Sequence, residues 1–447
     1  MKYIKRYNQI ISVLSVTIFL ISCNQTKVVH KEIPASKINE VVNEMIKVMV
    51  HDVTNPPLGS RFFAYSTLAG YEVISQNDTP FQSMRGVLNN YPFINKPAIT
   101  DCSYQAAALF SMIGVAAKLQ PSGILLDSIK NGFIRYLKEN EFSEKEIASS
   151  QAYATTIIDS ILSYAKRDGY RNISNYKRYT PEKGDGFWSP TPPAYMAALE
   201  PNFNKVSTFY TDAVGACKPS SPIQFNTNVQ SSFYKMMDSV YKESKSLNTE
   251  HRAIANFWDC NPFSMLDDGH LQIGIKKISP GAHWMGITSI ACTKANTSFD
   301  SALLIHTLIA TGMMDAFITC WNEKYRSNRV RPETVIRKYL DVSWQPLLQT
   351  PPFPEYPSGH SVVSSCSAEI LTWFFGNSFS YTDDVEKPYG LPSRNFTSFK
   401  SAAAEAAISR FYGGIHFMDA IVNGQVTGND VGKLVITKFS KQYINEQ

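Results

Sequence analysis

The feature of this sequence that most constrains its fold is an apolar stretch in the second half of the chain. Residues 301–321 read SALLIHTLIATGMMDAFITCW, with apolar side chains on every side of a helix. His306 and Asp315 interrupt the stretch, which argues against a helix surrounded by lipid. A helix without a polar face needs other protein around it. We therefore predict a buried helix within a helical bundle, with His306 as a core histidine whose hydrogen bonds are satisfied.

Apolar residues recur at helical spacing along most of the chain, and clean alternating runs are few. The expected fold class is therefore all-α, built from helical bundles. PPLGS, at residues 56–60, is expected to end the first helix. The predicted helices outside the apolar stretch span residues 37–53, 61–75, 105–119, 149–170 and 231–244.

The 447 residues, of which 44% are hydrophobic, are enough for two domains. We predict an N-terminal helical region at residues 23–205 and a second helical domain, carrying the active site, at residues 206–447. Residues 177–206 are dense in Pro, Gly and aromatic residues. They form either a linker between the helical halves or a loop that walls a pocket.

The net charge of +5 is spread along the sequence, which does not favour nucleic acid as a partner. The expected partners are small-molecule substrates, and an oligomer remains open.

The first residues predict an export signal. MKYIKRYNQ is basic, and the apolar run at residues 10–21 is too short for a comfortable membrane span. Leu20–Cys23 resembles a bacterial lipobox, which implies a signal peptide at residues 1–22 and lipidation of Cys23. The expected location is the bacterial cell envelope, with the protein membrane-anchored and facing the periplasm or exterior. The alternatives are an uncleaved anchor and a plain secretory signal.

Six cysteines remain after Cys23, an even number that would permit disulfides in an oxidising compartment. Several lie in apolar helical patterns and could instead be buried thiols. No CxxC pair or Cys/His cluster has the sequence spacing of a zinc site. The six are Cys102, Cys217, Cys260, Cys292, Cys320 and Cys366.

Three short segments carry the candidate chemistry: WNEKYRSNRVRPETV, PPFPEYPSGH and AAISRFYGGIHFMDA. Lys324, Arg331 and Arg410 supply cations, and arginine forks match the oxygens of a tetrahedral oxyanion. Ser358 offers a hydroxyl and Gly359 an unshielded N–H at the start of a helix, where anions are favoured. The set predicts a pocket for a multiply charged oxyanion such as phosphate.

His360 and His416 have no obvious duty in binding alone. One could attack or ligate the central atom, and the other could move protons near neutral pH. Taken singly, each polar residue of these segments is more often a surface group than a catalytic one.

Taken together, the segments resemble the three-part signature of one superfamily. Six residues separate Lys324 from Arg331-Pro332, Pro357-Ser358-Gly359-His360 follows, and five residues separate Ser409-Arg410 from His416. The superfamily unites type 2 phosphatidic acid phosphatases, bacterial soluble acid phosphatases and vanadium-dependent haloperoxidases. The resemblance covers residues 321–419 closely and implies a mainly α-helical fold whose second bundle holds the site.

Other residues resemble the haloperoxidase branch in particular. Phe353 with the Pro-x-Tyr lead-in, and Trp321 three residues before Lys324, have counterparts there that line the halide site in chloroperoxidases. A Trp and a Phe near apolar helices are otherwise core residues. NPPLGSRFFAYSTLAGYE and FWDCNP resemble segments of secreted bacterial haloperoxidase-like proteins.

The resemblance implies an enzyme that oxidises halide with hydrogen peroxide at a vanadate cofactor. His416 would ligate vanadium, and His360 would be the acid–base group. Lys324, Arg331 and Arg410 would neutralise vanadate oxygens, with Lys324 also polarising the peroxide. The alternative is a phosphomonoesterase without a cofactor, in which His416 attacks a phosphate substrate and forms a phosphohistidine. A binding protein with a vestigial site ranks last.

One position departs from the phosphatase pattern, which places an Asp four residues after the final His to orient its ring. Ala420 stands there, and the nearest carboxylate is Asp419. Asp419 and Asp259 are therefore candidates to support the site from behind the residues that contact the anion. Asp259 could equally cap a loop, and Glu355 is expected to face solvent.

Overall fold

Helix α10, Phe299–Ser327, contains the apolar stretch and is buried along most of its length. The computed structural model describes residues 32–444 except 79 and 269–270, so the predicted signal peptide and Cys23 lie outside the described residues. Within that part of the chain, α10 alone is long and apolar enough to cross a membrane, and its apolar window is entirely buried, as in a core helix. The buried helix is therefore confirmed.

His306 on α10 is a core histidine, as predicted. Its Nδ1 lies 2.7 Å from the Ala302 carbonyl oxygen, and its Nε2 lies 3.1 Å from the Ser289 hydroxyl. Burial lowers the pKa of His306 to about 4, so the ring is neutral and both nitrogens are satisfied.

The N-terminal helices pack against one side of α10 through α2, which is buried on most of its surface. The Asn55 side chain caps α2 by accepting a hydrogen bond from the Leu58 N–H. Pro56 and Pro57 occupy the first turn of α2, where a backbone N–H has no acceptor within the helix, so the missing proline N–H costs nothing. PPLGS therefore begins α2, and the prediction that it ends the preceding helix is wrong. The group comprises α1 (Ser36–His51), α2 (Pro56–Asn77), α3 (Tyr104–Leu119), α4 (Asp127–Glu139) and α5 (Glu144–Lys166).

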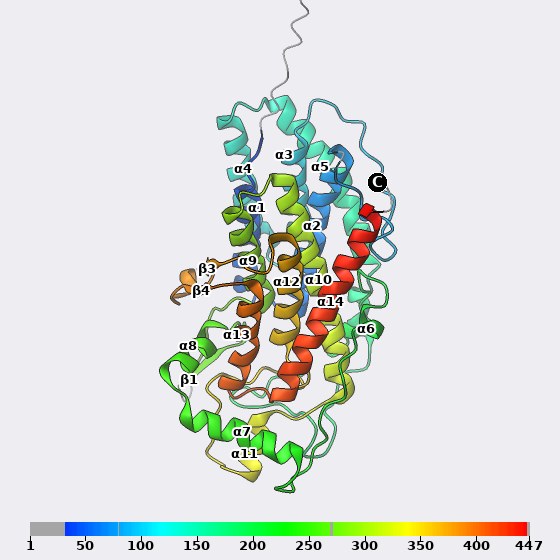
Figure 1. The fold of residues 1–447 in the computed structure, drawn as a ribbon. Helices are drawn as coiled ribbons and strands as arrows, with labels where there is room; N and C mark the ends of the chain where they lie inside the picture. Colours follow the sequence, from blue (N-terminus) through cyan, green and yellow to red (C-terminus); the bar gives the residue numbers. More distant parts are fainter. Residues whose placement is uncertain (1–31, 79, 269–270, 445–447) are drawn as a thin grey trace, which may run out of the picture. The chain divides into compact units, whose positions relative to one another are not determined.

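On the other side of α10 lie α12 and α14 (Figure 1). Gly424, Gly428 and Gly432 of α14 face the backbone of α12: a Cβ at Gly428 would lie 2.1 Å from the Val362 carbonyl oxygen. The remaining helices are α6 (Ala213–Ala216), α7 (Ser232–Ser246), α8 (Thr249–Phe257), α9 (Pro280–Lys294), α11 (Pro332–Tyr339), α12 (Gly359–Phe375), α13 (Phe399–Tyr412) and α14 (Met418–Ile444).

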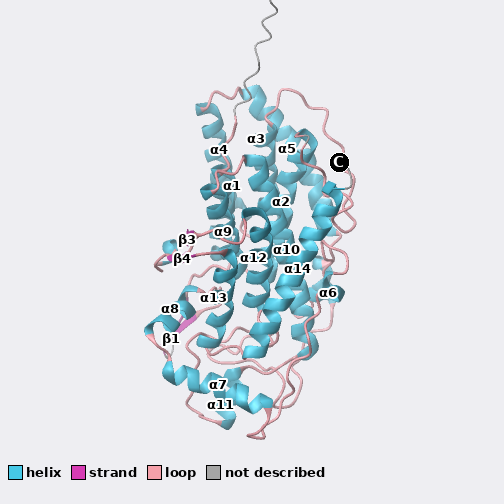
Figure 2. Ribbon diagram, in the orientation of Figure 1, coloured by secondary structure: helices cyan, strands magenta, loops and turns pink. Residues whose placement is uncertain are grey.

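Strands form only two small antiparallel hairpins in the described chain (Figure 2). The first pairs β1 (Met265–Asp268) with β2 (Leu271–Gly274), and the second pairs β3 (Tyr381–Asp383) with β4 (Arg394–Phe396). Short 3₁₀ turns lie at Gly123–Leu126, Tyr170–Asn175, Phe203–Lys205 and Lys387–Tyr389. The predicted all-α fold class is confirmed.

The loop-rich segment at residues 177–206 packs against the C-terminal end of α10 and against the proline-rich segment. The Leu199 carbonyl accepts hydrogen bonds from Trp321 Nε1 and from the Tyr325 hydroxyl, and its N–H donates to the Pro352 carbonyl. The segment therefore supports residues of the first and second candidate segments. The predicted domain boundary between residues 205 and 206 stays a prediction.

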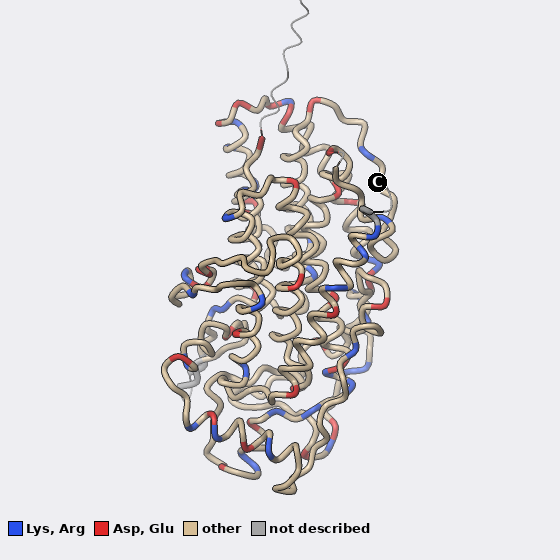
Figure 3. Tube along the Cα trace, viewed as in Figure 1, with Lys and Arg blue, Asp and Glu red and all other residues tan. Residues whose placement is uncertain are grey.

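The six described cysteines are all free thiols, and five of them are buried. Acidic and basic residues are intermixed along the described trace in this view (Figure 3).

Candidate active site

Lys324 lies near the end of α10 and is completely buried. Its Nζ donates to three carbonyl oxygens of the proline-rich segment, at 2.9 Å to Pro354, 3.0 Å to Glu355 and 2.6 Å to Pro357. Burial, together with nearby Arg331, lowers the pKa of Lys324 to about 7. The amine therefore holds the proline-rich loop and can gain or lose its charge near neutral pH.

Arg331 and His416 meet across the site. Arg331 precedes Pro332 at the start of α11, and its guanidinium is buried. It donates to the carbonyls of Phe353 and Ile415, both at 2.9 Å, and Nη1 lies 3.2 Å from His416 Nε2. Nη2 of Arg331 is buried and has no hydrogen-bond partner among the described residues. This leaves a buried cationic donor without an acceptor, which is costly unless a ligand completes it.

Glu355 corrects the sequence analysis, which expected it to face solvent. It is fully buried, and its Oε1 lies 2.8 Å from His416 Nδ1 and accepts from the Phe417 N–H at 2.9 Å. Because an ionised carboxylate only accepts, Nδ1 of a neutral His416 carries the proton and Nε2 keeps a lone pair. Burial and the surrounding cations lower the pKa of His416 well below its ordinary value. Glu355 thus fixes the ring and its tautomer.

Asp419 does not contact His416. Its carboxylate accepts two hydrogen bonds from Arg329, at 2.6 and 2.7 Å, and Arg329 also donates to Glu355. Arg329 therefore bridges the two carboxylates, and Glu355 holds the position beside the imidazole that the phosphatase pattern would give to an aspartate.

The proline-rich segment leads into α12. Ser358 is the N-cap, accepting from the Ser361 N–H at 3.3 Å, and its own N–H donates to the Ala420 carbonyl at 3.0 Å. The N–H groups of Gly359 and His360 belong to the first helical turn and have no acceptor within the helix. These donors and the helix dipole favour an anion at this end of α12.

His360 lies beside Arg410, with its Nε2 3.4 Å from Arg410 Nη1. Burial, Arg410 and His416 lower the pKa of His360 well below its ordinary value. An arginine can only donate, so Nε2 of the neutral ring is directed as an acceptor, and a backbone hydrogen bond with Trp258 holds the ring from its other side. His360 is therefore a positioned proton acceptor. Arg410 also donates to the Ser409 hydroxyl at 3.1 Å.

A mainly apolar cavity of about 30 Å³ lies at this site and is lined by some of these groups, although Lys324, Arg331 and Ser358 are not among its lining residues. Trp321 and Phe353 line it with ring centroids 5.0 Å apart, and Lys324 Nζ lies 5.0 Å from the Phe353 centroid. The wall also includes Pro56 and three residues of the FWDCNP segment, Cys260, Asn261 and Pro262. Other lining residues include Gly359, His360, Arg410 and His416.

Asp259 is buried and forms an ion pair with Lys277. Burial raises its pKa, while Lys277 and then Arg410 oppose that rise. Asp259 therefore contributes negative charge behind Arg410 and does not line the cavity.

Similarity to known proteins agrees with this geometry. Residues 304–446 match the family model described as the VCPO second helical-bundle domain. A holo-type bacterial vanadium-dependent chloroperoxidase aligns with a TM-score of 0.68 at 14% identity, over 93% of this chain and 99% of that one. The apo-type bacterial chloroperoxidase gives 0.65 at 15%, over 88% and 96%. These two matches establish a vanadium-haloperoxidase fold.

A nearer relative narrows the assignment. The structure of a bacterial vanadium-dependent iodoperoxidase shares 40% identity with a TM-score of 0.85, over 91% of this chain and 98% of that chain. The protein belongs to the vanadium-dependent haloperoxidase family, and it is a haloperoxidase-like enzyme. The phosphomonoesterase alternative is not favoured. A comparison with curated protein sequences finds no match.

The residues present fit a vanadate ion. Three buried cations, Lys324, Arg331 and Arg410, lie near the start of α12. The unpartnered Nη2 of Arg331 could donate a hydrogen bond to an anionic oxygen. His416 Nε2 keeps its lone pair in the neutral imidazole, and such a nitrogen can ligate a metal.

Proposed function

We propose that this enzyme oxidises halide with hydrogen peroxide at vanadate held by His416. The overall reaction is H₂O₂ + X⁻ + H⁺ → HOX + H₂O, in which peroxide oxygen is reduced and halide oxidised. The observation that carries the proposal is the alignment of Glu355, His416 and Arg331, which leaves the Nε2 lone pair facing a buried cation with an unsatisfied donor.

Vanadate, when bound, supplies a Lewis acid that activates hydrogen peroxide toward halide. The protein's own residues bind the anion and move the proton. Lys324, Arg331 and Arg410 neutralise anionic oxygens, and the Ser358 hydroxyl and the Gly359 N–H donate hydrogen bonds to them. His360 Nε2 takes the proton that hydrogen peroxide loses. Lys324 also polarises the peroxide, because its ammonium is buried where charge interactions are strong.

We further propose that iodide is the preferred halide. The support is the 40% identity to a bacterial vanadium-dependent iodoperoxidase across nearly the whole chain. Trp321 and Phe353 offer iodide a polarisable apolar wall beside the Lys324 ammonium. Iodide is also the easiest of these halides to oxidise. A kcat/KM for iodide at least tenfold above that for bromide is expected, and equal or higher values for bromide would contradict the preference.

The activity is tested with purified protein lacking residues 1–23. Iodide and bromide oxidation by hydrogen peroxide is measured with and without orthovanadate, and with phosphate as a competitor. We expect activity that requires vanadate, falls with phosphate and drops at least a hundredfold in His416→Ala. His51→Gln, at an exposed position on α1, is the matched control and should keep full activity. Vanadate-inhibited hydrolysis of an aryl phosphate without halide oxidation would overturn the proposal.

We also propose that the enzyme is attached to the bacterial cell envelope through a lipid on Cys23. The support is the basic, apolar and Leu-Ile-Ser-Cys sequence of the first 23 residues. Metabolic labelling with a fatty acid should mark the full-length protein and not Cys23→Ser. Equal labelling of both would show that Cys23 is not the attachment point.

A further inference from the structure

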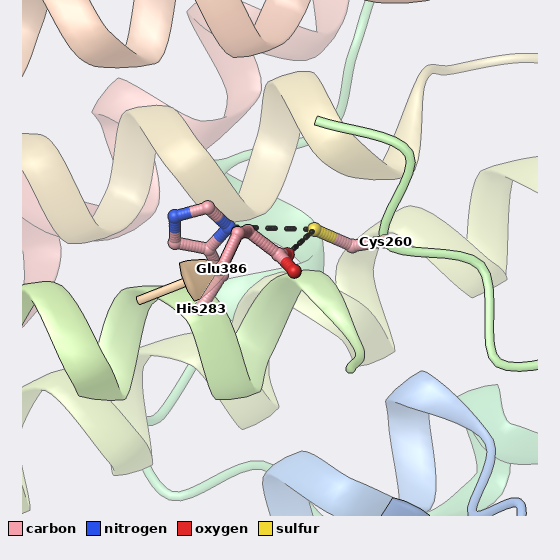
Figure 4. A group of neighbouring side chains, drawn as sticks. All are labelled: Cys260, His283 and Glu386. Carbon is pink, nitrogen blue, oxygen red and sulfur yellow. Dashed lines mark hydrogen bonds and ion pairs between the residues drawn. The ribbon is translucent and has the colours of Figure 1, made fainter. Parts of the chain in front are cut away.

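A second cluster of ligand-type side chains lies beside the cavity, outside the anion site. Cys260 comes from the segment after α8, His283 from α9 and Glu386 from the loop after β3 (Figure 4). The three side chains are buried and point toward one another. Cys260 Sγ lies 3.4 Å from His283 Nδ1 and 3.4 Å from Glu386 Oε1, and Nδ1 lies 3.4 Å from Oε1.

These distances match those between the ligands of a tetrahedral metal. Ligands bound to zinc at about 2.0 to 2.3 Å lie roughly 3.4 to 3.6 Å apart. The three atoms therefore already form one face of such a tetrahedron. The fourth position would be filled by water, because the described groups of this kind within reach number three.

The imidazole has the support that a metal-bound histidine usually has. His283 Nε2 lies 2.8 Å from Asp383 Oδ2, and both side chains are fully buried. A carboxylate on Nε2 holds the proton there and leaves Nδ1 free to ligate. The Trp258 ring stacks on the imidazole at 4.6 Å and 20°, which fixes the plane of the ring.

Two carboxylates already face the cluster. Glu386 lies beside the Cys260 sulfur and Asp383 beside the far side of the His283 ring. A cation bound between the three side chains would therefore be buried next to negative charge that is already in place.

We propose that Cys260, His283 and Glu386 bind one divalent transition-metal ion, best matched by zinc, at a site separate from vanadate. Thiolate and imidazole at tetrahedral spacing favour zinc over magnesium or calcium, which prefer oxygen ligands. Cys260, Asn261 and Pro262 line the cavity. The ion therefore ties that wall to α9 and to the β3 loop, and it positions the wall without taking part in halide oxidation.

Cobalt tests the site directly, because its spectrum reports the ligands. The protein without residues 1–23 is stripped with a chelator and titrated with Co²⁺, then with Zn²⁺. We expect one cobalt per chain, a near-ultraviolet thiolate-to-cobalt band, visible bands of a four-coordinate ion, and loss of all these bands on adding zinc.

Variants assign the ligands. Cys260→Ser should remove the thiolate band, and Glu386→Gln should weaken cobalt binding at least tenfold. Cys292→Ser, which alters a buried thiol of the same helix α9 outside the cluster, should leave the spectrum unchanged.

The wild-type titration keeps the proposal falsifiable even if a variant fails to fold. No thiolate band in the wild-type protein, or an equal band in folded Cys260→Ser, would overturn the site and leave the cluster as a protonated ion-pair network. None of these readouts depends on haloperoxidase activity, so they stand or fall apart from the proposed function.

Discussion

At the residue scale, the Glu355 carboxylate holds His416 in place through its hydrogen bonds. It joins His416 and the Phe417 N–H on one oxygen and Arg329 on the other. Groups behind a metal ligand typically change metal affinity by 10- to 100-fold when they are replaced, because they set the ligand's tautomer and basicity.

We therefore expect Glu355→Gln to weaken vanadate binding by about 10- to 100-fold. Asp419→Asn is the matched control, since it also loses a charge beside Arg329 but leaves the Glu355–His416 contact in place. Vanadate dissociation constants measured for both folded variants check the prediction. Equal losses of vanadate affinity in the two variants would mean that the neutralisation of Arg329, and not the Glu355–His416 contact, supports vanadate binding.

Lys324 should make anion binding depend on pH. Its pKa of about 7 means that above pH 7 the amine of the empty site loses its charge and one of its three hydrogen bonds to carbonyl oxygens, and that it must regain the proton when an anion binds. Affinity should then fall by about tenfold per pH unit above 7. The two histidines are neutral throughout this range and do not contribute to the slope.

Calorimetric titration with sulfate, whose charge is constant from pH 6 to 9, measures this slope. Lys324→Arg is the comparison, because arginine keeps its charge at these pH values. A flat profile in the wild-type protein, or the same slope in Lys324→Arg, would assign the proton to another group.

At the scale of elements, the close contact of α12 and α14 places the start of α12 against the residues after His416. Gly424, Gly428 and Gly432 repeat every four residues, so they share one face of α14. A Cβ at Gly428 would collide with backbone, which cannot move aside as a flexible side chain can.

Gly428→Ala is therefore expected to lower the free energy of unfolding by about 1–3 kcal/mol, since overpacking forces the helices apart. Gly215→Ala is the control, because an added Cβ there meets nothing within 4 Å. Denaturant unfolding of both variants gives the comparison. An unchanged Gly428→Ala would mean that α14 shifts without cost.

The sequence predicted the helices well, because they follow a local pattern, while the anion-binding roles of the residues in the three segments stay predictions. The helical periodicity located α10, and the three segments located Lys324, Arg331, His360 and His416. It missed Glu355, because prolines on both sides resemble an exposed loop. The available signal was Arg329, a second arginine close to Arg331 with no assigned partner.

The cluster of Cys260, His283 and Glu386 could not be predicted from spacing. His283 lies 23 residues after Cys260, and Glu386 lies 126 residues after it. Only the packing of three separate elements brings the three side chains together. The four-residue glycine repeat of α14 was readable, but a repeat of small residues does not say which helix it faces.

At the scale of the whole molecule, one hydrophobic core contains residues from both halves of the chain. It includes Val42 of α1, Leu68 of α2 and Leu303 of α10 together with Val363 of α12. Gly70 lets α2 approach α10 closely, since a Cβ there would lie 3.0 Å from the Leu303 side chain.

Because the core is shared, we expect residues 24–447 to unfold in a single thermal transition. Scanning calorimetry checks this, and the calorimetric and van't Hoff enthalpies should agree. Two separated transitions would instead support independent domains on either side of residue 205.

The small volume of the cavity has a consequence for what is finally halogenated. The cavity of about 30 Å³ must also hold vanadate, so we expect the anion, peroxide and halide to fill it and a phenol or diketone to stay outside. The oxidised halogen must then leave before it meets an organic molecule. Which carbon atom is modified would be decided by the nucleophilicity of the acceptor in solution, and the products should carry no stereochemical imprint of the protein.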